Sequence, residues 1–175
     1  MDLSEQILHA ESGAEARRLA DHIASDPERF EVLMQNLLHG EWRLSQRASW
    51  IVGMCADADR QLVAPYLEAM LRRLDAPHHE AVRRNVIRIF QDIDPPESLL
   101  GELVDRCFRY LADPQQPAAV RVFAISVLYR ASLREPDLQN ELRLLIESHL
   151  PHASAGFRSR GKKILARMDK SYSKK

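Results

Sequence analysis

The 175-residue sequence contains little glycine and cysteine and has no net charge. Its six glycines do not cluster into a loop that could cradle a phosphate. Cys55 and Cys107 have apolar neighbours in separate segments, so we expect buried free thiols, not a disulfide or a metal site. No apolar run approaches the roughly 18 residues needed to span a bilayer, and the first residues lack the basic-then-apolar pattern of a secretion signal. We therefore expect a cytoplasmic protein without a membrane partner.

Strands are also missing from the pattern, because valine and isoleucine do not alternate with polar residues. Apolar residues instead recur at helical spacing in two sets of segments. The A helices are predicted at residues 27–38, 60–74, 97–112 and 137–149. The B helices are predicted at residues 41–56, 79–92, 118–133 and 154–168. Prolines with acidic neighbours mark three of the starts, at Pro27, Pro95-Pro96 and Pro136.

An arginine recurs at one phase of the B helices. Arg47, Arg83, Arg121 and Arg158 are separated by 36, 38 and 37 residues. Recurrence at this period is typical of a stacked-repeat protein. We predict one domain over residues 1–170, followed by a basic tail over 171–175. Within it we expect an N-terminal cap over 3–24 and repeats over 26–56, 59–92, 94–133 and 135–168.

The helical pairs resemble the HEAT repeat. The features that carry this resemblance are a proline inside the first helix, an aspartate in a short turn, and Val-Arg at the start of the second helix. The best copy comprises Leu62-Val63-Ala64-Pro65-Tyr66-Leu67, Asp75 and Val82-Arg83, and the next unit has Asp113 and Val120-Arg121. The resemblance covers residues 26–168 and extends to small stand-alone bacterial HEAT-like proteins. It implies an all-α fold, a right-handed α–α superhelix of the HEAT/ARM type with about four helix pairs, and no particular activity.

Charge is divided between the two helix sets. The segments 41–56, 78–92, 118–134 and 153–170 hold 14 basic and 4 acidic residues, a net charge of +10. The segments 26–39, 59–75, 94–113 and 135–150 hold 7 basic and 15 acidic residues, a net charge of −8. The resemblance implies that the B helices form an inner, concave layer. We therefore predict a basic concave surface that attracts an anionic partner.

The basic residues are assigned to two roles. Those at the shared phase are predicted to form a structural ladder that bonds to turn aspartates or to helix C-terminal carbonyls of adjacent repeats. The ladder comprises Arg47, Arg83, Arg121, Asp75 and Asp113. The predicted binding residues are Arg43, Arg84, Arg88, Arg130, Arg158, Arg160, Lys162 and Lys163. Arg167 and Lys170 extend the last basic cluster.

The favoured function is a non-catalytic binding or scaffold module for an acidic protein segment, acting as a monomer or weak homodimer. A nucleic-acid partner, bound through its phosphate backbone, is the alternative. A glycosylase similar to HEAT-like DNA alkylation repair proteins ranks third. Trp42 and Trp50 suggest that comparison, but no carboxylate follows either at one-turn spacing. Trp50 has the phase of a core residue, so we expect it to be buried.

The remaining candidates for chemistry are histidines. His78 and His79 are adjacent in a predicted turn, where neighbouring side chains point apart. His149 and His152 could approach each other, but no third ligand is evident nearby. We expect no metal, no cofactor and no catalytic residue.

Overall fold

The computed structural model describes residues 2–172, and this part of the chain contains helices and turns but no strand. Of the predicted basic tail, residues 173–175 lie outside the described residues. The chain groups into two compact units, Met1–Ile89 and Phe90–Lys175. The all-α prediction is confirmed.

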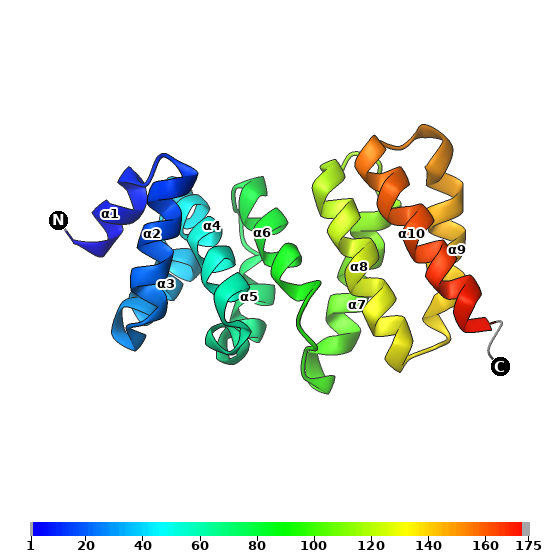
Figure 1. Ribbon diagram of the computed structural model, residues 1–175, viewed down its shortest axis with the longest axis horizontal. Coiled ribbons are helices and arrows are strands. Elements are labelled where there is room, and N and C mark those ends of the chain that lie inside the picture. The colour runs from blue at the N-terminus through cyan, green and yellow to red at the C-terminus, as the bar shows by residue number, and fades with distance from the viewer. Residues whose placement is uncertain (1, 173–175) are drawn as a thin grey trace. The chain divides into compact units, whose positions relative to one another are not determined.

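The first unit is built around helix α4. Its elements are α1 (Leu3–His9), α2 (Gly13–Ala24), α3 (Pro27–His39), α4 (Trp42–Ala58), the 3₁₀ turns η1 (Arg60–Leu62) and η2 (Ala64–Tyr66), α5 (Leu67–Arg73) and α6 (Glu80–Phe90), whose last residue begins the second unit (Figure 1). Helix α4 packs against α1, α2 and α3. Side chains such as Ile23, Leu33 and Ile51 are fully buried and form its core.

The second unit is built around helix α8. Its elements are α7 (Glu97–Ala112), α8 (Ala118–Arg134), α9 (Leu138–His149), the turn η3 (Leu150–His152) and α10 (Ala155–Tyr172). Helix α8 packs against α7, α9 and α10. The core includes Leu103, Ile125 and Phe157, each almost completely buried.

One predicted helix is wrong. Residues 60–74 form two 3₁₀ turns and the short helix α5 instead of one continuous helix. Pro65 explains the break, because proline has no N–H to donate and its ring clashes with the preceding helical turn. The other A and B helices match their predicted ranges to within a few residues, with the largest difference at the end of α10.

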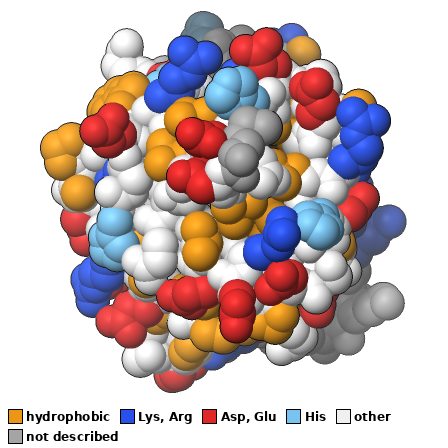
Figure 2. All heavy atoms as spheres, turned by 90° about the vertical axis from the view of Figure 1, so that its left-hand side faces the viewer, with side chains coloured by type: hydrophobic (Ala, Val, Ile, Leu, Met, Phe, Trp, Pro, Cys, Tyr) orange, Lys and Arg blue, Asp and Glu red, His pale blue; other side chains and the backbone are white. Residues whose placement is uncertain are grey.

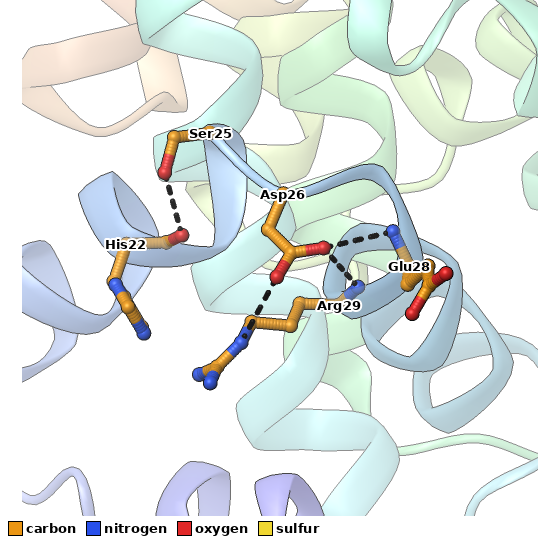
Figure 3. Close-up of polar contacts among 5 residues, drawn as sticks. All are labelled: His22, Ser25, Asp26, Glu28 and Arg29. Carbon is orange, nitrogen blue, oxygen red and sulfur yellow. Dashed lines mark hydrogen bonds and ion pairs between the residues drawn. The ribbon is translucent and has the colours of Figure 1, made fainter.

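Proline and aspartate begin α3 as the sequence predicts. The Asp26 carboxylate accepts hydrogen bonds from the backbone N–H groups of Glu28 and Arg29, at 3.1 and 3.2 Å, and Pro27 occupies the first turn (Figure 3). Asp26 also forms an ion pair with Arg29 at 3.2 Å. These bonds satisfy N–H groups that have no partner inside the helix. They fix the residue at which α3 starts.

Gly161 permits close packing of α10 against the preceding helix. A Cβ at this position would approach Ile146 Cγ2 to 2.9 Å and Leu150 Cδ2 to 3.4 Å. Gly101, on α7, has nothing within 4 Å of the equivalent position. The two helical glycines therefore differ in what surrounds them.

We predict opposite effects of alanine at these two sites. Gly161→Ala should lower the free energy of unfolding by about 1–3 kcal/mol, because α9 and α10 must move apart. Gly101→Ala should raise it by about 0.5–1 kcal/mol, since alanine favours the helix and meets no obstacle. Urea unfolding of the two variants measures both changes. Equal stability of Gly161→Ala and the wild type would contradict the close packing.

Candidate functional site

Three of the four phase-matched arginines donate hydrogen bonds to backbone carbonyls at helix ends. Arg47 on α4 bonds to the carbonyl of Ala10, at the end of α1, at 3.1 Å. Arg158 on α10 bonds to the carbonyl of Ala153, at the end of η3. The fourth, Arg83, is half-buried on α6. Carbonyls in the last turn of a helix have no intrahelical donor, so an arginine is a suitable partner for them.

Arg121 shows this arrangement most fully. Its Nε and Nη2 atoms donate to the carbonyl of Leu111, at 3.1 and 3.0 Å, and its guanidinium lies 4.7 Å from the centre of the Phe157 ring. The residue is only 7% exposed. Burial lowers the pKa of Arg121, an effect that the charge of Asp113 opposes. Arg121 thus joins α7, α8 and α10.

One of the two turn aspartates, Asp113, accepts hydrogen bonds within its own turn. Asp113 accepts hydrogen bonds from the backbone N–H of Gln115, at 2.9 Å, and from the side chain of Gln116, at 3.0 Å. Its influence on Arg121 is through its charge. Asp75 is exposed in the turn after α5. Asp113 therefore holds its own turn, as expected for aspartate between two helices.

A second group of arginines forms ion pairs. Arg88 on α6 contacts both carboxylate oxygens of Asp57, at 2.9 and 2.6 Å. Arg130 on α8 contacts Asp94 at 2.6 Å. Arg134 pairs with Glu97. These three carboxylates each offset one positive charge of the B helices.

The repeat length could have revealed one of these pairs. Asp94 and Arg130 are 36 residues apart, which is one repeat. The charge count placed Asp94 with the A helices, although its side chain contacts a B helix.

Several basic side chains of α8 and α10 lie close together in the second unit. A hollow of about 390 Å³ lies between α8 and α10. We call it the basic groove. Its lining residues are Gln91, Asp92, Ser126, Tyr129, Arg130, Leu133, Arg160, Lys163, Ile164 and Arg167. Three of the predicted binding residues, Arg130, Arg160 and Lys163, are therefore brought together here.

Some cations of the basic groove have an ion-pair or hydrogen-bond partner within the protein, and others do not. Arg130 is held by Asp94, and Arg160 donates to the Ser126 hydroxyl. Lys163 and Arg167 are exposed and form no ion pair with any described residue. One carboxylate, Asp92, lines the groove. The groove therefore keeps a net positive charge that can attract an anion.

Other predicted binding residues do not line this groove. Lys162 and Arg158 are exposed on α10, and Arg43 and Arg84 are exposed in the first unit. Arg88 is half-buried in its ion pair with Asp57. Tyr129 and Leu133 of the groove were missed by sequence reasoning. Leu133 is 59% exposed, and a leucine in an amphipathic helix gives no sign of exposure by itself.

The two tryptophans have different surroundings. Trp42, the first residue of α4, is 56% exposed, and its ring meets the ring of His79 edge-on at 5.7 Å. Trp50 is half-buried, so the prediction that it belongs to the core is only partly met. Its neighbours in sequence, Ser49 and Ile51, are buried.

Residues capable of metal or thiol chemistry are dispersed or buried. Cys55 and Cys107 are free and buried, as predicted, and burial raises the pKa of each thiol to about 12. Burial, with a smaller effect of the Arg121 charge, lowers the pKa of His149. Within residues 2–172, no three His, Cys, Asp or Glu side chains lie close enough together to hold a metal ion.

The N-terminal end of the first unit, formed by α1 and α2, offers a second hollow with a different lining from that of the basic groove. Figure 2 shows apolar side chains in the middle of this face, with Asp, Glu, His, Lys and Arg side chains among and around them. A hollow of about 220 Å³ at this end of the unit is lined by Gln6, His9, Ala10, Glu15 and Leu19. Among the residues that line this hollow there is one carboxylate, Glu15, and no Lys or Arg, so the hollow does not favour an anionic partner. The basic groove is therefore the better candidate for an anion.

The repeated helix pairs and their carbonyl-bound arginines define an all-α repeat protein. The chain belongs to the HEAT repeat domain family, whose family model matches residues 3–168. Comparison with curated proteins and with solved structures gave no match. In the described part of the chain, no helix has both the length and the apolar character needed to cross a membrane. Membership of this family indicates a helical-repeat scaffold or interaction module.

We predict that Arg121 and Arg84 differ sharply in their effect on stability. Arg121→Met should lower the free energy of unfolding by about 2–3 kcal/mol, because the Leu111 carbonyl loses its donor in a buried site. Arg84→Met removes an exposed charge from α6 and should change stability by less than about 0.5 kcal/mol. Urea unfolding of both variants makes the comparison. A small effect of Arg121→Met would show that the carbonyl contact contributes little.

Proposed function

We propose that the chain is a non-catalytic interaction module that binds an acidic segment of a partner protein in the basic groove. The observation that carries this proposal is the presence of two unpaired cations, Lys163 and Arg167, beside the exposed side chain of Leu133. Cations without a carboxylate partner are available for an incoming anion. An exposed leucine beside them offers an apolar contact to the same ligand.

The charge of the groove supports an anionic ligand. Arg130 and Asp94 compensate each other, whereas Arg160, Lys163 and Arg167 are opposed only by Asp92 among the residues that line the groove. Carboxylates approaching this wall would gain Coulomb energy and charge-assisted hydrogen bonds. Part of that gain should vanish in salt, since Lys163 and Arg167 are exposed.

The apolar lining favours a protein segment over a nucleic acid. Leu133 is 59% exposed and Tyr129 is half-buried, and both lie among the cations. Protein interfaces draw most of their affinity from buried aromatic or apolar anchors surrounded by polar groups. Nonspecific nucleic-acid binding draws on phosphate contacts instead and falls steeply with salt.

We predict that charge reversal in the groove weakens the binding of an acidic peptide. The Lys163→Glu, Arg167→Glu double variant should bind a fluorescein-labelled, glutamate-rich peptide with one central leucine at least about tenfold more weakly than the wild type. The matched control is Arg60→Glu, which reverses an exposed, unpaired charge on η1. Fluorescence anisotropy at low and at physiological salt measures the affinities.

Two comparisons test the class of partner. A peptide in which serine replaces the leucine should bind more weakly, because the contact with Leu133 is lost. A labelled single-stranded DNA should bind more weakly than the leucine peptide at physiological salt. Tighter binding of the DNA, or equal binding by the double variant and the wild type, would contradict the proposal.

A further inference from the structure

The two walls of the basic groove carry side chains at the same helical spacing. Helix α8 contributes Ser126, Tyr129, Arg130 and Leu133, and helix α10 contributes Arg160, Lys163, Ile164 and Arg167. Each set occupies positions i, i+3, i+4 and i+7 of its helix. With a rise of 1.5 Å per residue, each wall is about 10 Å long. The groove therefore follows two helices that lie side by side and pack against each other.

The cations of α10 have a spacing that a helical ligand can match. Along the helix axis, Lys163 lies about 4.5 Å beyond Arg160, and Arg167 about 6 Å beyond Lys163. Carboxylates at i, i+3 and i+7 of a second helix repeat these intervals. An extended strand places side chains of one face about 6.7 Å apart, so three of them span about 13 Å, which exceeds the length of the wall.

The apolar residues of the groove suit the same ligand. Leu133 is 59% exposed, whereas Ile164 is 2% exposed at the base of the α10 wall. A helix lying between two others buries one apolar stripe against both, at interaxial distances of 8–10 Å. An amphipathic helix binds in a groove by placing such an apolar stripe against the groove's apolar residues.

We infer that the groove recognises its partner as an amphipathic helix with carboxylates at i, i+3 and i+7 and an apolar residue at i+4. This inference rests on the proposed function and specifies the conformation and the residue spacing of the acidic segment. Asp92 disfavours a further carboxylate at its position in the groove. The partner's acidic residues are therefore confined to the stripe that faces α10.

The test compares peptides of identical composition on the full chain. One peptide carries glutamates at i, i+3 and i+7 with leucine at i+4, and the other carries the glutamates at alternate positions. A third peptide has the helical spacing and a central proline, which breaks the helix. The first should bind at least about tenfold more tightly than the other two, because they align fewer carboxylates with the cations. Far-UV circular dichroism should show a gain of helix when it binds.

Lys163→Glu should reduce the advantage of the helical spacing, and Arg60→Glu should preserve it. Equal affinity of the first two peptides, or binding without a gain of helix, would overturn the inference but leave the acidic-segment proposal intact. Failure of all three peptides to bind the wild-type chain would overturn both.

Discussion

The last carbonyls of an α-helix have no N–H partner within the helix, and every helix pair in this chain must provide for them. Arg47 and Arg121 do so from a neighbouring B helix, and Arg158 bonds to the carbonyl that ends the turn before its own helix. Arginine suits this task, because its planar guanidinium carries several donors on a long side chain and keeps its charge when partly buried. The recurrence of one residue type at one phase therefore has a local cause, the need for a donor at each helix end.

Because helix-end carbonyls occupy some arginines, the net positive charge of the B helices does not measure how many cations a ligand can reach. Some arginines of the basic layer are occupied by carbonyls, others are paired with carboxylates, and a remainder is unpaired. Whether an arginine has a carboxylate partner depends on which residue lies one repeat earlier in the sequence. Arg130 meets Asp94, 36 residues earlier, whereas the residue 36 positions before Arg167 is Ala131, inside α8. The last helix pair lacks a carboxylate at this position, and Arg167 forms no ion pair with a described residue.

The sequence predicted the repeat and most helix boundaries, because an arginine phase, apolar periodicity and proline starts are local signals. It was wrong for residues 60–74, where Pro65 breaks the helix although the apolar spacing continues. The ion pair between Asp94 and Arg130 escaped prediction because it joins a loop to a helix one repeat later. Lys163 was predicted from its charge alone. The exposure of Leu133 required the packing of α8 against α10, which no local pattern reveals.

Stability and the proposed binding depend on different residues in the second unit. Arg121 is buried between helices, so its loss affects the fold. Lys163 and Arg167 are solvated, so their replacement changes the surface at little cost in stability. Both side chains start from the rigid backbone of α10, and a preformed helix loses little conformational entropy when a ligand binds. A repeat protein of this kind can therefore change its partner by altering a few solvated positions while its carbonyl-bound arginines keep the helices in register.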